Sequence, residues 1–444
     1  MRINCATNMK KLIDRLIQNR NEIIWVMFGQ SLFFLGAAGS IKILTNLMGP
    51  TGYGELALGL SLAGMVTTFF FGPIGQAVVR FFSAYQEDNE LGFYFYLLKK
   101  GHLLIVVVLL CCTILTGSIV YVLSGYEWAI LIIMALLFSI VNGVNNSLTS
   151  LQNAMRQRKV AALHQGGEAV FRPLFALCVI SLLGNSGASA ITGFLLLSIF
   201  IVLSRTKFIQ NNKNVQSNWR GKRPPPNILK SRMRGFFSYA SPFMAISIFV
   251  ALSTYSDRWI LLALLGSHEV GIYASIYQIA SAPILFLSNI LFQLAIPVIF
   301  ERAGTLTSNN QIKDSLRLLR YLILSSSALM IIVFSLGSYF SKIFVEILST
   351  PEFSEYHGML WVIMLGCYFF TMGQILFVKA QIFKKPKVIL PTWIIKTISF
   401  FVMAIILIKK IGVSGAAFAY CLSSLMFLLS VFFTCKNITL PNNP

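Results

Sequence analysis

Apolar runs recur along almost the whole of this chain, and they constrain its fold more than any other feature. Each run approaches the roughly 20 residues that an α-helix needs to cross a hydrocarbon core of about 30 Å. Only 11% of the residues are charged, whereas soluble domains carry roughly a quarter. The sequence therefore predicts an all-α polytopic membrane protein.

We expect twelve transmembrane helices, of which the fifth has a polar first half. The loops on one side are very short, which leaves no room there for a separate domain. The expected spans are 23–46, 54–74, 103–124, 127–149, 166–184, 187–205, 236–265, 272–299, 320–346, 358–378, 388–409 and 412–434.

Lys and Arg are distributed unevenly between the two sides. Nearly all of those outside the spans lie in the N-terminal segment or after even-numbered spans, and only Lys409 and Lys410 lie in a loop on the other side. Cytoplasmic loops carry such an excess and face anionic phospholipids. Both termini are therefore expected in the cytoplasm. The net charge of +21 follows this pattern, and no nucleic-acid partner is expected.

The layout predicts two bundles joined by a linker. Residues 1–205 form an N-terminal six-helix bundle that begins with an interfacial helix around "MKKLIDRLIQ", whose apolar residues share one face. Residues 206–235 are polar, basic and contain "RPPPN", which favours an extended cytoplasmic linker. Residues 236–444 form the C-terminal six-helix bundle.

An internal repeat relates the two bundles. The segment "ILTNLMGPTGYGELALGLSLA" (43–63) aligns with "ILLALLGSHEVGIYASIYQIA" (260–280) at an offset of 217 residues. Gly49 then aligns with Gly266, and Gly54 aligns with Gly271. Because each half has an even number of spans, the halves are expected to be parallel repeats about an axis along the membrane normal.

The stretches "LMGPTGYGELAL", "GPIGQAVVRF" and "SDRWILLALLGSHEVGIYASIYQIASAP" resemble the Wzx-type polysaccharide (O-antigen) flippases of the multidrug/oligosaccharidyl-lipid/polysaccharide exporter superfamily. The resemblance implies two bundles around a central cavity that work by alternating access in the bacterial inner membrane. It implies an undecaprenyl-pyrophosphate-linked oligosaccharide as substrate, moved from the inner to the outer leaflet, with a polysaccharide polymerase and a chain-length regulator as partners.

Charged residues inside the spans are candidate functional groups, because charge in hydrocarbon is costly. Lys42 and Arg258 lie one position apart in the repeat, and Lys396 lies near the middle of the eleventh span. They either line a cavity that binds a diphosphate or, for Lys42 and Arg258, extend toward the membrane interface. Asp257 either neutralises Arg258 or titrates in ion coupling. Lys342 is interpreted as an interfacial anchor.

His164, Glu168 and Arg172 recur every four residues and form one polar stripe on the fifth span. They are either a structural ion pair with a neighbouring histidine or the polar wall of a cavity. Arg80, at the cytoplasmic end of the second span, is either an anchor or a contact for a head group at the substrate's point of entry.

No nucleotide-binding loop, metal-ligand spacing or hydrolase motif occurs, so we expect neither an enzyme nor a metal or other cofactor. A multidrug or cation exporter of the same superfamily is the main alternative, although the first span carries Lys42 and no carboxylate. A membrane-embedded glycan polymerase or transferase is disfavoured by the short outward loops. Peptidoglycan-precursor flippases have fourteen spans, two more than expected here.

Overall fold

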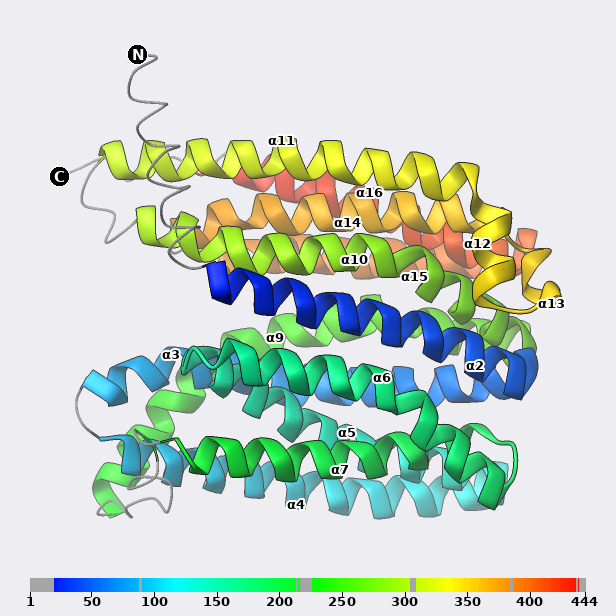
Figure 1. Cartoon of the computed structure of the whole chain (residues 1–444), viewed down its shortest axis with the longest axis horizontal. Coiled ribbons are helices and arrows are strands. Elements are labelled where there is room, and N and C mark those ends of the chain that lie inside the picture. The colour runs from blue at the N-terminus through cyan, green and yellow to red at the C-terminus, as the bar shows by residue number, and fades with distance from the viewer. Residues whose placement is uncertain are drawn as a thin grey trace.

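The structure, a computed structural model, describes residues 20–87, 90–212, 215, 226–303, 309–383, 386–436 and 438, and the regular elements in these ranges are helices (Figure 1). The first group, which we call the N-half, comprises α2 (Arg20–Val66), a π-helix (Thr67–Phe71), α3 (Gly72–Glu87), α4 (Leu91–Ser124), α5 (Tyr126–Ala154), α6 (Arg158–Leu183) and α7 (Gly187–Gln210). The second group, the C-half, comprises α9 (Pro226–Leu264), α10 (Ser267–Ala303), α11 (Asn309–Tyr339), α12 (Ser341–Leu348), α13 (Pro351–Ser354), α14 (Met359–Ile382), the 3-10 turn Pro386–Ile389, α15 (Leu390–Ile411) and α16 (Ser414–Lys436).

Within these ranges, eleven helices are long and apolar enough to cross a membrane. The first, Ile23–Phe82, has 60 residues and would be about 90 Å long if it were straight. Gly49, with φ 63° and ψ −178°, instead reverses the chain between two antiparallel segments (Figure 1). Because this helix therefore provides two crossings, the twelve predicted spans are present.

The predicted repeat has a direct structural counterpart. Gly49 and its equivalent Gly266 both have positive φ, and each lies at the turn between two long helices. Gly54 of α2 packs so closely on α10 that a Cβ atom there would lie 1.9 Å from the carbonyl oxygen of Ser267. A Cβ atom on Gly271 would lie 1.9 Å from the carbonyl oxygen of Pro50. Because Pro50 and Ser267 are also 217 residues apart, the contact is reciprocal, as two-fold-related repeats require.

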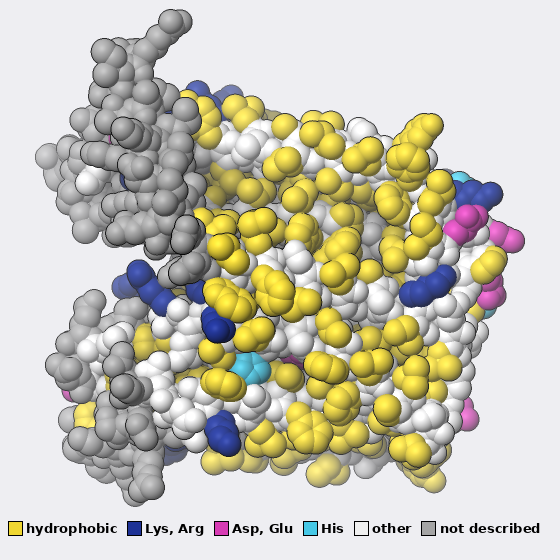
Figure 2. Space-filling view, viewed as in Figure 1, with side chains coloured by type: hydrophobic (Ala, Val, Ile, Leu, Met, Phe, Trp, Pro, Cys, Tyr) yellow, Lys and Arg dark blue, Asp and Glu magenta, His cyan; other side chains and the backbone are white. Residues whose placement is uncertain are grey.

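The bundle has two chemically different ends. Exposed Lys and Arg gather at the end where α2 begins and α16 finishes, which we call the basic end, and they include Lys100, Lys207, Arg234, Arg317 and Lys436. The opposite end, the acidic end, carries Glu127, Glu269, Glu352 and Glu355. Figure 2 shows a broad belt of hydrophobic side chains between the two ends. This arrangement suits a protein whose middle is surrounded by lipid.

Several helices extend beyond their predicted limits. The third, fifth and seventh spans begin at Leu91, Arg158 and Pro226, where we had expected 103, 166 and 236. The polar first turns remain helical because they project past the hydrocarbon or face other helices. The ninth span is divided, since α11 ends at Tyr339 and α12 follows. The interfacial N-terminal helix, and residues 213–214 and 216–225 of the predicted linker, lie outside the described residues.

Candidate functional site

A cavity of about 330 Å³ lies between the two halves, where α2, α5, α6 and α7 face α10. Most of its polar lining residues carry neutral amide side chains, and we call it the amide cavity. Its polar lining residues are Gln30, Asn142, Asn145, Asn146, Thr149, Gln165, Glu168, Arg172, Arg205, Asn289 and Gln293. Amides both donate and accept hydrogen bonds, so this wall suits a ligand that is rich in hydroxyl groups.

The amide cavity lies toward the basic end. Thr149 and Arg205 are each five residues before the last residue of their helix at that end, which corresponds to a helical rise of about 8 Å. Asn289 of the C-half donates to the Oε1 atom of Gln30 in the N-half at 3.4 Å, so the cavity wall includes a contact between the halves.

A second cavity of about 230 Å³ adjoins the first and reaches toward the acidic end. The two share Phe33, Ala169 and Arg172 as lining residues. The second cavity is mainly apolar, and we call it the apolar cavity. Its apolar lining residues include Phe34, Ile41, Leu44, Leu56, Leu60, Phe194, Leu285 and Phe286. The space between the halves is therefore polar near the basic end and apolar toward the acidic end.

The predicted polar stripe on α6 contributes to the amide cavity. Glu168 is buried, and its two carboxylate oxygens accept hydrogen bonds from Arg172 Nη2 and Asn145 Nδ2, each at 2.8 Å. The Arg172 guanidinium also lies 5.3 Å from the ring centre of Phe194. The two readings of the stripe are therefore compatible, because Glu168 and Arg172 form an ion pair that is also part of the cavity wall.

His164 belongs to the same stripe but does not line the cavity as the described residues define it. Its Nε2 atom lies 3.0 Å from the hydroxyl of Ser204 on α7, and its Nδ1 atom lies 2.8 Å from the carbonyl oxygen of Val160. A ring held on both sides in this way connects α6 to α7. The imidazole therefore stabilises the packing of α6 against α7 behind the cavity wall.

Asp257 and Arg258 form a buried ion pair inside the C-half. Arg258 Nη1 donates to Asp257 Oδ1 at 2.8 Å, and the guanidinium lies 5.0 Å from the ring centre of Tyr277. The relative exposures of the two residues are 3% and 8%, so neither faces the surrounding lipid. The pairing is the neutralising role that the sequence suggested for Asp257.

Lys396 is 1% exposed and lies between α9, α14 and α15. Its ammonium donates to Ser253 Oγ at 3.4 Å and lies 4.4 Å and 5.4 Å from the ring centres of Phe370 and Trp393. Neither Lys396 nor Arg258 lines the amide or apolar cavity as the described residues define them. That they contact the substrate stays a prediction.

Lys42 connects the two halves at the acidic end. Its ammonium donates to the carbonyl oxygens of Ser349, at 2.7 Å, and Glu346, at 3.3 Å, next to the end of α12. Tyr53 lies in the same region and donates to Gln278 Oε1 at 3.0 Å. Together with the contact between Gly54 and Gly271, these bonds close the acidic end beyond the apolar cavity.

Lys42→Met is expected to weaken this closure by about 1 kcal/mol, because the bonds to carbonyl oxygens disappear from a half-exposed and partly screened site. Pulsed electron paramagnetic resonance between spin labels at Tyr126 and Lys410, in a cysteine-free background, should detect a larger share of long distances at the acidic end. Lys342→Met is the matched control, since Lys342 is exposed and lies 3.9 Å from Glu346 within its own helix. Equal distance distributions in both variants would contradict the claim that Lys42 holds the acidic end closed.

The two remaining sequence candidates lie on the surface. Arg80 is exposed on α3, and Lys342 is exposed on α12.

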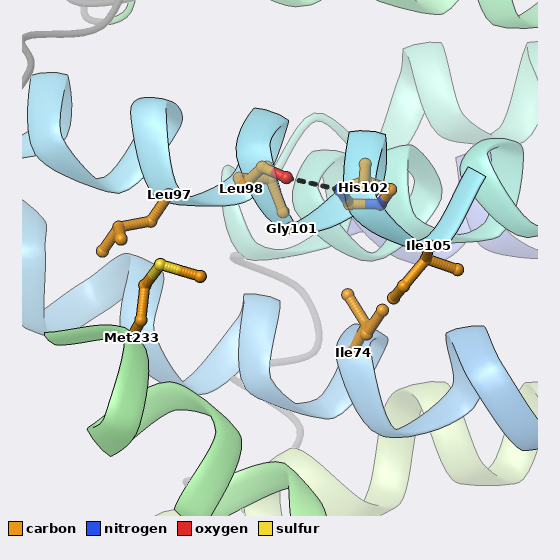
Figure 3. Close-up of a pocket in the computed structure, with 7 residues that line it drawn as sticks. All are labelled: Ile74, Leu97, Leu98, Gly101, His102, Ile105 and Met233. Atoms are coloured by element: carbon orange, nitrogen blue, oxygen red, sulfur yellow. Dashed lines mark hydrogen bonds between the residues drawn. The ribbon is translucent and has the colours of Figure 1, made fainter. Parts of the chain in front are cut away.

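A small crevice of about 20 Å³ lies between α3, α4 and α9. Figure 3 shows that Ile74 faces Ile105 there and that Met233 of α9 reaches toward Leu97. His102 borders this crevice, and its Nδ1 atom lies 2.8 Å from the Leu98 carbonyl oxygen. This space holds about one water molecule and cannot accommodate a sugar.

Residues 20–302, well over half of the chain, match the family model described as polysaccharide biosynthesis protein. The chain belongs to the polysaccharide biosynthesis protein family. No protein with a curated description matches it. Together with its apolar helices, this match identifies it as a multi-pass membrane protein of that family.

Solved structures of the MOP superfamily share its fold. An inward-facing MATE multidrug resistance transporter is 13% identical, with a TM-score of 0.64 over 93% of this chain and 94% of that chain. The lipid II flippase MurJ in an inward closed conformation is 15% identical, with a TM-score of 0.67 over 93% of this chain and 87% of that chain. A MOP superfamily transporter from Pyrococcus furiosus is 15% identical, with a TM-score of 0.57 over 96% of this chain and 95% of that chain. Identities this low establish the fold alone.

The most informative cavity residue of this polysaccharide biosynthesis protein is one that the sequence did not single out. Arg205 is the last residue of the expected sixth span and adjoins the predicted linker, yet it is fully buried in α7 and lines the amide cavity. Its Nη1 atom donates to Gln152 Oε1 at 2.7 Å. The signal available in the sequence was its position only two residues after the apolar run "SIFIVL" (198–203).

Proposed function

We propose that this protein flips an undecaprenyl-pyrophosphate-linked oligosaccharide, the repeat unit of an O-antigen or another surface polysaccharide, from the inner to the outer leaflet by alternating access. The observation that carries the proposal is the amide cavity between the halves. Its side chains can replace the water that solvates sugar hydroxyls, which would otherwise be costly to bring into the membrane. Membership of the polysaccharide biosynthesis family supports the same substrate class.

The orientation completes the proposal. With the basic end in the cytoplasm of a bacterium, as the distribution of Lys and Arg favours, the amide cavity lies near the inner leaflet, where the lipid-linked unit is made. The acidic end, which Lys42 and the two glycines close, then faces outward. Anionic phospholipids would surround the basic end, and a polymerase and a chain-length regulator would receive the repeat unit on the far side.

Export of organic cations is the competing function, because MATE transporters share the fold. An accessible carboxylate favours the binding of a lipophilic cation, because it offsets the charge in the membrane interior. Among the described residues that line the amide cavity, Glu168 is the one acid, and it already accepts hydrogen bonds from Arg172 and Asn145. This pairing favours the glycan substrate.

Deletion of the gene tests the function directly. Loss of long surface glycan, with lipid-linked repeat units accumulating on the cytoplasmic side, is the expected result, and the wild-type gene should restore the glycan. Unchanged surface glycan together with a lower tolerance of toxic organic cations would instead establish the exporter.

Arg258→Ala and Lys396→Ala test the cations that lie outside the cavity. If they meet the diphosphate at any stage of transport, each variant should reduce surface polysaccharide severalfold while the protein remains inserted in the membrane. The measurement is the amount of surface glycan, normalised to the amount of membrane-inserted protein. Normal polysaccharide in both variants at native expression would refute a role of these residues in substrate binding.

A further inference from the structure

Arg205 is a buried cation whose hydrogen-bonding capacity is largely unused. One guanidinium nitrogen donates to Gln152, whereas Nε and Nη2 have no acceptor within the described residues. The residue has a relative exposure of 0%, so these donors are closed to water in this structure. Buried charged donors without partners are costly, and such groups in native proteins usually await a water molecule, an ion or a ligand.

The charges around Arg205 do not balance. Glu168 is the acid of this cluster, and its carboxylate is occupied by Arg172 and Asn145 at 2.8 Å each. Two guanidinium groups therefore share one carboxylate. Arg172 also has an Nε atom without an acceptor in the part of the chain that the structure describes. The wall of the amide cavity accordingly has one uncompensated positive charge and several unused N–H donors.

The position of this charge matches a lipid head group better than a sugar. Arg205 is five residues before the end of α7 at the basic end, at a helical rise of about 8 Å from it. Phosphates of membrane lipids lie at the boundary of the hydrocarbon core, which is the level that the last turns of spanning helices reach. Guanidinium groups bind phosphate oxygens with paired, charge-assisted hydrogen bonds.

We propose that Arg205 and Arg172 form the subsite that binds the pyrophosphate of the lipid carrier, with the amide side chains beside them holding the first sugars. Glu168 competes with the ligand for Arg172 and limits the positive charge of the empty cavity. This inference rests on the proposed function and locates its anionic subsite in the N-half, near the basic end. It differs from the sequence-based assignment, which placed the cations for the diphosphate at Lys42, Arg258 and Lys396.

Binding of farnesyl pyrophosphate to the purified full-length protein in phosphatidylcholine nanodiscs tests the subsite by isothermal titration calorimetry. Arg205→Gln should weaken binding about 10- to 100-fold, the usual loss when a charge-assisted hydrogen bond is removed. Arg317→Gln is the matched control, because Arg317 is exposed at the basic end and pairs with Asp314 at 3.4 Å. Equal affinities of wild type and Arg205→Gln would overturn the subsite.

Glu168→Gln is expected to change the binding affinity in the opposite direction. It therefore tests the subsite even if Arg205→Gln loses binding only because it misfolds. Removing the one carboxylate leaves both guanidinium groups to the ligand, so binding of farnesyl pyrophosphate should become several times tighter. A purely structural role of Glu168 predicts equal or weaker binding, and that result would overturn the subsite.

Further titrations distinguish the pyrophosphate of the carrier from phospholipid head groups. They also distinguish failure of the subsite from failure of the proposed function. Farnesol should not bind, and inorganic pyrophosphate should compete with farnesyl pyrophosphate. Phosphatidylglycerol in the nanodisc should compete only weakly; strong competition would assign the subsite to phospholipid head groups and overturn the carrier assignment. Binding of tetraphenylphosphonium but not of farnesyl pyrophosphate by the wild type would contradict the proposed function itself, whereas a defect of the subsite alone leaves wild-type binding intact.

Discussion

Gly271→Leu is expected to abolish most transport while leaving the protein inserted in the membrane, because the acidic ends of the two halves could no longer meet. A Cβ atom at this position would lie 1.9 Å from the carbonyl oxygen of Pro50, and backbone atoms cannot move aside as a flexible side chain can. Overpacking costs about 1–3 kcal/mol, and here the cost falls on the state closed at the acidic end. That state should become about 5- to 150-fold less populated.

The measurement combines flux with distance. Spin labels at Tyr126 and Lys410 should move apart at the acidic end, and labels at Lys207 and Gln381 should approach each other at the basic end. Gly39→Ala is the control, since a Cβ atom at Gly39 meets nothing within 4 Å. Normal transport by Gly271→Leu would show that the halves need not close through this contact.

The reciprocal nature of the contact gives a sharper version of the same test. Gly54→Ala and Gly271→Ala add methyl groups on opposite sides of one interface, so either substitution alone should force the helices apart. The double variant should then cost less than the sum of the two single variants, because neighbouring sites are coupled. Strict additivity would argue that the two positions act separately.

Asp257→Asn is expected to have the largest effect on stability, about 3–5 kcal/mol, because it leaves Arg258 as a buried cation without its carboxylate. Asp257 accepts from Arg258 at 2.8 Å, and both residues are buried within the C-half. Thermal unfolding in detergent should show a clearly lower midpoint and a lower yield of inserted protein. The cause is an unpaired buried charge and not a lost contact with substrate.

A second substitution tests this cause. Asp257→Asn combined with Arg258→Met removes both charges of the pair and should recover most of the lost stability, since replacing a buried ion pair by apolar groups is often near neutral. Lys396→Met should also change stability little, because its ammonium makes a single hydrogen bond of 3.4 Å to Ser253. A double variant that is as unstable as Asp257→Asn alone would contradict the explanation by charge.

The sequence predicted the fold well because its signals were local or periodic. Apolar runs located the spans, and the alignment of Gly49 with Gly266 located two turns that both require positive φ. The alignment of Gly54 with Gly271 marked residues that prove to touch each other across the halves. The helix limits at Leu91 and Arg158 were missed, since a polar helical turn outside the hydrocarbon resembles a loop in hydropathy.

The site was predicted only in part, because a sequence shows that a charge lies in a span but not which neighbours it meets. Glu168 and Arg172 were identified through their spacing, which places them on one face of α6. Lys396 was expected in a cavity, yet its neighbours are Ser253 and two aromatic rings from other helices. Arg205 was not singled out, because it lies at the end of an expected span next to the basic linker, and only the packing of α5, α6 and α7 reveals its burial.

Flipping by the purified protein in proteoliposomes tests the central claim most directly. A fluorescent undecaprenyl-pyrophosphate oligosaccharide, placed in one leaflet, should become accessible to an impermeant quencher on the other side when the wild-type protein is present. Arg205→Gln and Gly271→Leu should slow this movement at equal protein content. No movement of the glycolipid by the wild type, with uptake of an organic cation by the same vesicles, would contradict the account.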